Sequence, residues 1–123
     1  RRDFVHVSDV ARACRLALES DAATGPAING GSGVSVAIAD VARAMAKALD
    51  IDDAPPEITG QFRVGDIRHC FADITLAREV LGYAPRMTFE RGLAELVEWM
   101  QDQQAIDRVD AATAELQSRG LQR

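Results

Sequence analysis

Side chains that could do chemistry concentrate in two stretches of the 123-residue chain, residues 2–11 and residues 62–74. Both stretches contain arginine, aspartate and histidine. Almost all of the positive charge is arginine, with Lys47 as the single lysine. Arginine suits the bidentate binding of phosphate or carboxylate, but a bias in the base composition of the gene explains an arginine excess equally simply. By themselves the two stretches fit either an anion site or a solvated surface.

The histidines and cysteines do not form a recognisable metal or disulfide pattern. Neither His6 nor His69 has a second His or Cys at metal-ligand spacing, so we expect both to be structural. Two cysteines do not make a disulfide framework. Cys14 falls on the apolar face of a predicted helix, where we expect a buried free thiol, and Cys70 lies in the second stretch.

The composition, 47% hydrophobic and 27% charged, is that of one small globular domain. A net charge of −5 argues against nucleic acid as the main partner. No apolar run approaches the length of a membrane span and no signal peptide is visible, so the sequence predicts a cytoplasmic protein without membrane contact. The chain begins with Arg1, in a stretch that already resembles a strand, and we expect a fragment of a longer protein.

Apolar residues recur at helical spacing in five segments. The predicted helices cover 9–20, about 35–49, 74–81, 88–100 and an amphipathic tail from residue 106. The expected N-caps are Ser8 or Asp9, Ser35, Asp73 and Thr88, and Gly82 follows the third helix as a C′ glycine. We expect Phe89 and Trp99 in the core, and Asp50, Asp52 and Asp53 in a solvated loop.

Short strands are predicted at 3–7 and 27–29, with a further edge strand at 57–59. An isolated pair of strands is marginal in water. We therefore expect the first two strands to complete a sheet made by residues outside this chain. The glycine run 30–33 is too short for a dinucleotide fingerprint and predicts a tight turn.

The order of several motifs resembles that of the extended short-chain dehydrogenase/reductases. The motifs are Arg2-Asp3-Phe4-Val5-His6-Val7, Ile28-Asn29-Gly30-Gly31, Arg63-Val64-Gly65-Asp66, the run from Ala72-Asp73 to Leu81-Gly82-Tyr83-Ala84-Pro85, and then Gly92-Leu93 and Trp99. The resemblance covers about residues 1–104 and points to the nucleotide-sugar epimerases and dehydratases, such as the UDP-glucose 4-epimerases. The tail, 105–123, is similar to that of some bacterial dTDP-L-rhamnose 4-epimerases.

This resemblance implies an α/β fold: the carboxyl-terminal, substrate-binding part of an extended Rossmann-type enzyme, mostly helices with a few short strands. Residues 1–104 would form the substrate-binding region and residues 105–123 a helical tail. NAD would be bound by a missing amino-terminal Rossmann domain. The implied partners are that domain and a nucleotide-sugar substrate, with a homodimer as the full-length form.

Residue roles also follow from the resemblance. Arg2 and Arg63 match arginines that contact the nucleotide diphosphate, and Asp66 matches the acid that accepts hydrogen bonds from the ribose. Two guanidiniums can clamp a pyrophosphate, and Gly65 permits a sharp turn between Arg63 and Asp66. An acid after glycine is also an ordinary turn residue, and Asp3 could pair locally with an arginine.

The catalytic parts of the family are missing from the sequence. Family members use the tyrosine of a Tyr-x-x-x-Lys motif, helped by Ser or Thr, while NAD carries the hydride. The single tyrosine, Tyr83, is followed four residues on by Met87, and Lys47 lies far upstream. The glycine-rich cofactor fingerprint is absent as well. We therefore expect no catalytic residue, no NAD binding and no turnover by this chain alone.

Three interpretations stay open from the sequence. The favoured one is the substrate-binding part of an NAD-dependent nucleotide-sugar 4-epimerase, with dehydratase, decarboxylase or reductase chemistry as the alternative. The second is a non-catalytic module that binds a nucleotide-sugar or a protein partner. The third is a defective fragment that aggregates through exposed apolar surfaces.

Overall fold

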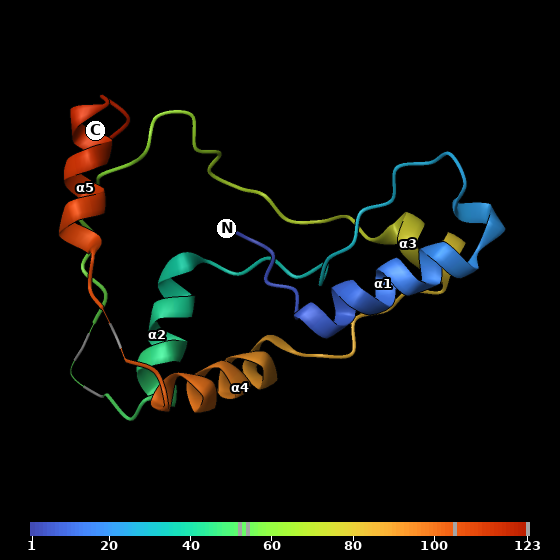
Figure 1. The fold of residues 1–123 in the computed structure, drawn as a ribbon, viewed down its shortest axis with the longest axis horizontal. Helices are drawn as coiled ribbons and strands as arrows, with labels where there is room; N and C mark the ends of the chain where they lie inside the picture. Colours follow the sequence, from blue (N-terminus) through green and yellow to red (C-terminus); the bar gives the residue numbers. More distant parts are fainter. Residues whose placement is uncertain (52, 54, 105, 123) are drawn as a thin grey trace.

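The computed structural model describes residues 1–51, 53, 55–104 and 106–122 (Figure 1). Helices dominate this part of the chain, so the expected architecture of mostly helices with little strand is confirmed. The elements are α1 (Val7–Glu19), the 3-10 turn η1 (Asp21–Ala23), α2 (Ile38–Ala48), α3 (Thr75–Leu81), α4 (Phe89–Gln101) and α5 (Val109–Ser118).

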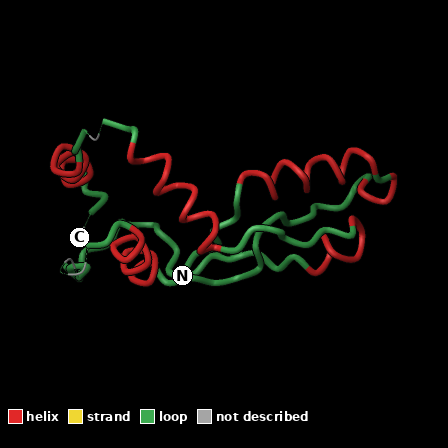
Figure 2. The backbone as a smooth tube through the Cα atoms, turned by 90° about the horizontal axis from the view of Figure 1, so that it is seen from below, coloured by secondary structure: helices red, strands yellow, loops and turns green. Residues whose placement is uncertain are grey.

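The strands predicted at 3–7, 27–29 and 57–59 do not form within the described residues. Pairing is limited to single bridges, which join Arg2 to both Val36 and Cys70 and join Arg63 to Gln122. A strand needs several successive pairs, and each extended segment here meets its neighbour at one position only. Figure 2 shows these segments as loop, without any strand.

Helix starts differ from the prediction where the extended segments hold the chain. α1 begins at Val7, and the ring of His6 rather than Ser8 or Asp9 accepts the first capping hydrogen bond. The predicted cap Ser35 is also wrong, because Val36 exchanges two backbone hydrogen bonds of 2.9 Å with Arg2 and stays extended. α2 therefore starts only at Ile38.

The later helix ends are close to those predicted. Asp73 accepts the amide of Thr75 at 2.9 Å, although Ile74 occupies the N-cap position of α3. Gly82 ends α3 in the left-handed conformation (φ 60°), as expected of a C-terminal glycine. Thr88 caps α4 by accepting the amide of Arg91, which confirms that prediction.

The buried core is small and has two parts. Ile74, Ala77 and Tyr83 form one cluster, against which Ala13 and Leu16 of α1 pack. On α4, Leu93 and Val97 are buried, and this helix contacts α2. The buried residues of the described chain therefore join α1 to α3 and α2 to α4.

Two core predictions are wrong. Cys14 is exposed because α1 turns Ala13 and Leu16 inward and leaves the opposite face, with Leu18 89% exposed, without cover among the described residues. Trp99 is 60% exposed because α4 buries Leu93 and Val97 instead.

The predicted burial of Phe89 and the predicted exposure of Asp50 and Asp53 agree better with the structure. Phe89 is half-buried, and its ring centroid lies 5.7 Å from that of Phe4. Asp50 and Asp53 are exposed as expected, whereas Asp52 lies outside the described residues.

Among the helices that the structure describes, none combines the length and the apolar character needed to span a bilayer.

Candidate functional site

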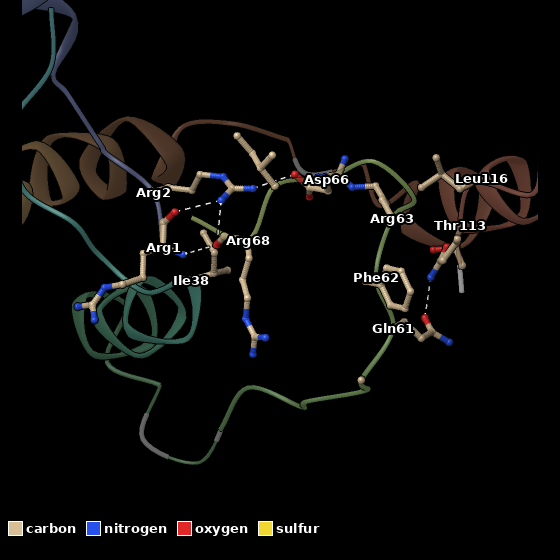
Figure 3. Close-up of a pocket in the computed structure, with 13 residues that line it drawn as sticks. Arg1, Arg2, Ile38, Gln61, Phe62, Arg63, Asp66, Arg68, Thr113 and Leu116 are labelled. Atoms are coloured by element: carbon tan, nitrogen blue, oxygen red, sulfur yellow. Dashed lines mark hydrogen bonds and ion pairs between the residues drawn. The ribbon is translucent and has the colours of Figure 1, made fainter. Parts of the chain in front are cut away.

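A cavity of about 990 Å³ lies between the amino-terminal segment, the loop 60–68 and helix α5 (Figure 3). The charged residues that line it are Arg1, Arg2, Arg63, Asp66 and Arg68. Four guanidiniums against one carboxylate give this lining a formal charge of +3, although the chain as a whole carries −5. The field in the cavity therefore favours an anionic ligand.

Asp66 joins the two arginines that the sequence singled out. Its Oδ1 lies 2.8 Å from Nη2 of Arg2, and its Oδ2 lies 3.2 Å from Nη2 of Arg63. Gly65 has φ +82°, and the amide of Asp66 donates to the carbonyl of Arg63 at 3.2 Å. The expected turn therefore exists, and it brings all three predicted site residues together.

Arg2 is held at both its backbone and its side chain. The backbone pairs with Val36, and Nη1 donates to the carbonyls of Arg1 at 3.0 Å and Arg68 at 3.3 Å. The side chain of Arg63 is 61% exposed and its described ion pair is with Asp66. Because a guanidinium has five N–H donors, both arginines keep donors for a ligand.

Asp3, next to Arg2, fastens three extended segments together. Its carboxylate accepts the amides of Ser32 at 2.9 Å, Gly33 at 3.0 Å and Ala72 at 3.2 Å, and the hydroxyl of Ser32 at 2.5 Å. The local pairing with an arginine that the sequence allowed for Asp3 is not found among the described residues, because backbone amides and the Ser32 hydroxyl occupy the carboxylate. Burial raises the pKa of Asp3, but these hydrogen bonds outweigh it and hold the pKa below its ordinary value.

The glycine run 30–33 bends at Gly31, but its described backbone does not form the hydrogen bond of the predicted tight turn. Packing explains one of its glycines. Gly31 is buried, and a Cβ atom there would lie 2.6 Å from Cβ of Ala72 and 2.8 Å from Oδ2 of Asp3. At those distances a Cβ atom overlaps its neighbours, so only glycine fits at position 31. Gly31 therefore allows the close approach that lets Asp3 reach the amides of Ser32 and Gly33.

Asp9 is the important residue that the sequence reasoning missed. It is 1% exposed, and its carboxylate accepts the backbone amides of Arg86 at 3.0 Å and Met87 at 2.9 Å and the guanidinium of Arg12 at 3.0 Å. Burial raises the pKa of Asp9, but the Met87, Arg86 and Arg12 donors lower it overall. An acid followed by arginine three residues later in a helix was the available signal, but it is equally common on exposed helices.

Arg12 and Tyr83 complete this buried contact. The Arg12 guanidinium also donates to the carbonyl of Ala84 and lies 5.1 Å from the centre of the Tyr83 ring. The Tyr83 hydroxyl donates to the carbonyl of Gly31 at 2.8 Å. Burial, and next the charge of Asp9, raise the pKa of Tyr83 above its ordinary value. These features describe a packing residue rather than a proton donor to a ligand.

The histidines lie outside the cavity. Nδ1 of His6 lies 2.7 Å from the hydroxyl of Ser8, and Nε2 lies 3.1 Å from Glu95, so its predicted structural role is confirmed. His69 is exposed. Among the residues that the structure describes, no three His, Cys, Asp or Glu side chains gather as metal ligands would.

Comparison with known proteins gives consistent matches. The family model described as GDP-mannose 4,6-dehydratase matches residues 1–96. A dTDP-L-rhamnose 4-epimerase of Burkholderia thailandensis is 36% identical over 107 residues, which cover 87% of this chain and 28% of that protein. A UDP-glucose 4-epimerase of Mycolicibacterium smegmatis is 36% identical over 104 residues, which cover 82% of this chain and 31% of that protein.

The fold is similar to that of a solved enzyme, WbmF of Bordetella bronchiseptica. Its complex with NADH superposes with a TM-score of 0.66 at 27% identity, covering 81% of this chain and 29% of WbmF. Its complex with NAD+ and UDP gives a TM-score of 0.65 at 25% identity. The chain thus spans about three-tenths of the length of the relatives that it matches.

Proposed function

Because the chain belongs to the GDP-mannose 4,6-dehydratase family of extended short-chain dehydrogenase/reductases, we propose that it is the substrate-binding part of an NAD-dependent nucleotide-sugar 4-epimerase. The observation that carries this proposal is the bridge from Asp66 to Arg2 and Arg63 at the wall of a cationic cavity. In the proposed complex the two guanidiniums bind the diphosphate, and Asp66 accepts hydrogen bonds from the ribose hydroxyls.

The charges in the cavity support this division of roles. With two arginines on one carboxylate, each guanidinium has donors left over for phosphate oxygens. Asp66 also keeps the like-charged side chains of Arg2 and Arg63 close together before a ligand arrives. A site that is ordered in advance binds more tightly, because less side-chain entropy is lost on binding.

Epimerisation at C4 is favoured because two relatives at 36% identity are 4-epimerases. Dehydration is the alternative, supported by the description of the matching family and by a dTDP-glucose 4,6-dehydratase of Streptomyces niveus at 34% identity. A non-catalytic nucleotide-sugar-binding module is a further alternative. The homodimer and the cytoplasmic location stay predictions.

The glycine run of this chain does not fit the pyrophosphate of NAD. In the glycine run, the amides of Ser32 and Gly33 already donate to Asp3, and Gly31 is buried against Ala72. A pyrophosphate needs such amides free to bind it. We therefore propose that NAD binds to the part of the related enzymes that this chain does not match. We also propose that this chain alone does not turn over substrate.

Calorimetric titration with UDP-, dTDP- and GDP-sugars tests the proposal, with NAD as the negative ligand. One nucleotide class should bind. Arg63→Ala should weaken that binding by about 2–4 kcal/mol, because a phosphate loses a charged partner. Arg43→Ala is the matched control, since Arg43 also forms an exposed ion pair with an aspartate three residues away but lies on α2 outside the cavity lining.

The control should bind within about threefold of the parent chain. An Arg63→Ala variant that binds equally well would show that the diphosphate assignment is wrong. If a folded parent sample binds none of the nucleotide-sugars, the proposed site is wrong for this chain.

A further inference from the structure

The carboxyl-terminal tail folds back onto the loop that carries Arg63. After α5, Gly120 adopts φ 65°, and the amide of Leu121 donates to the carbonyl of Leu116 at 2.9 Å. This turn places Leu121 and Gln122 beside the loop. Gln122 forms an antiparallel bridge with Arg63, and the carbonyl of Leu121 accepts the amide of Val64 at 2.8 Å.

A side-chain contact reinforces the backbone pairing. Nε2 of Gln122 donates to Oε1 of Gln61 at 2.6 Å. The tail also lines the cavity itself, through Thr113, Leu116 and Gln122. Figure 3 shows Thr113 and Leu116 beside Phe62 and Arg63, with Arg1 and Arg2 on the other side of the cavity.

Apart from the ion pair between Arg2 and Asp66, few other described contacts hold the loop. Its residues from 60 to 66 are all exposed and belong to no helix. The turn itself contributes one described backbone bond, from the amide of Asp66 to the carbonyl of Arg63, and an exposed segment of this kind opens easily. Together with the ion pair between Arg2 and Asp66, the hydrogen bonds from the tail are therefore the long-range contacts that hold the backbone of Arg63 in the described structure.

We infer that the tail, residues 106–122, is a positioning element of the anion site: it fixes the loop and so orients Arg63 toward the diphosphate. This inference rests on the proposed function of the site. The match to the family model ends at residue 96, so the tail lies outside the region that this model matches. Small displacements of a charged group strongly reduce its interaction with a ligand, which makes the tail a determinant of affinity.

The test compares the parent chain with Leu116→Asn, which disturbs the tail without adding a charge to the cavity lining, and with a chain that ends at Asp107. Removal of the tail should not unfold the rest, because none of the buried apolar residues of the described chain lies in the tail. These residues are Ile74, Ala77, Tyr83, Leu93 and Val97. Circular dichroism and urea unfolding check this. Arg119→Ala is the control, since Arg119 lies in the tail, pairs with Glu115 and does not line the cavity.

Titrations with UDP, dTDP, GDP and inorganic pyrophosphate measure the effect. Both tail variants should lose about tenfold or more in affinity for the diphosphate that binds best, and Arg119→Ala should lose none. In an Arg63→Ala background, Leu116→Asn should cause no further loss, because the tail acts through Arg63.

Each other outcome is decisive. If the parent binds and both tail variants bind within threefold of it, the inference is overturned and the proposed function stands. A full additional loss from Leu116→Asn in the Arg63→Ala background overturns it too, because the tail would then act independently of Arg63. If the parent binds no diphosphate, or binds it as weakly as Arg63→Ala does, the proposed function fails and takes the inference with it.

Discussion

The Oδ2 atom of Asp9 lies 2.9 Å from the backbone nitrogen of Met87, although 78 positions separate the two residues. The same carboxylate accepts the amide of Arg86, so one buried side chain joins the first turn of α1 to the linker between α3 and α4. This contact fixes the amino-terminal end of α1, which directly follows the extended segment that carries Arg2. The stability of the fold and the geometry of the site therefore depend on a residue outside the cavity.

Asp9→Asn should lower the free energy of unfolding at pH 7 by about 2–3 kcal/mol, because an amide nitrogen would then face backbone N–H donors. Asp40→Asn is the matched control: Asp40 also lies in the first turn of a helix and pairs with an arginine three residues on, but it is exposed. The control should change stability by less than about 1 kcal/mol. Urea unfolding measures both, and equal effects would refute the structural role of Asp9.

The pH dependence of stability should follow Asp3 and Asp9. Both have a pKa below the ordinary value of 3.8 in the fold, so the unfolded chain binds more protons in acid. Their contribution is complete above about pH 5 and is lost as pH falls through the lowered pKa values. Urea midpoints between pH 6 and pH 2.5 should fall steeply below pH 4. Asp9→Asn should show a shallower fall, and an unchanged slope would contradict the assignment.

Gly31→Ala should destabilise the chain by about 1–3 kcal/mol, because the new methyl group would overlap Ala72 and the Asp3 carboxylate. The neighbouring Gly30→Ala is the control, since its Cβ would lie 3.8 Å from Ala13, an ordinary contact. That variant should stay within about 1 kcal/mol of the parent. Thermal unfolding of the two alanine variants side by side decides the matter, and similar midpoints would speak against a close approach at Gly31.

Asp66→Asn should separate recognition of the ribose from recognition of the diphosphate. Affinity for UDP should fall about tenfold, because the ribose hydroxyls lose a charged acceptor. Affinity for inorganic pyrophosphate should hold or rise, because the formal charge of the cavity lining increases from +3 to +4. Calorimetry with both ligands makes the comparison. A parallel loss for both would mean that Asp66 serves only to order Arg2 and Arg63.

Helices could be predicted from the sequence where a local signal sets their ends. Thr88 and Gly82 are such signals, since a cap or a left-handed glycine acts on its own turn. Ser35 failed because a distant partner, Arg2, keeps Val36 extended. The prediction of which face of α1 is buried was wrong for a related reason. Periodicity shows that Cys14 and Leu18 share an apolar stripe, but it does not show which stripe packs against the core.

The residues of the proposed site could be named from the sequence, but the contacts among them could not. Resemblance identified Arg2, Arg63 and Asp66, and the structure brings them into contact across 64 positions. Hydrogen bonds from side chains to distant amides leave no periodic pattern in a sequence. The buried contacts of Asp9 could therefore not be predicted, nor could the Asp3 junction, the set of hydrogen bonds by which Asp3 joins the segments of Ser32 and Ala72. The pairing of the tail with Arg63 was hidden in the same way, because backbone groups form it.

The Asp3 junction has a consequence for the order in which the molecule folds. Helices form from contacts within a few residues, in about a microsecond. Asp3 meets the amide of Ala72 only after a span of 69 positions has closed, and closing such a span is entropically unfavourable until other contacts compensate. Arg2 precedes Asp3 directly, so we expect the proposed anion site to assemble in the late steps of folding. A chain caught early on this route would already have its helices but not yet the proposed site.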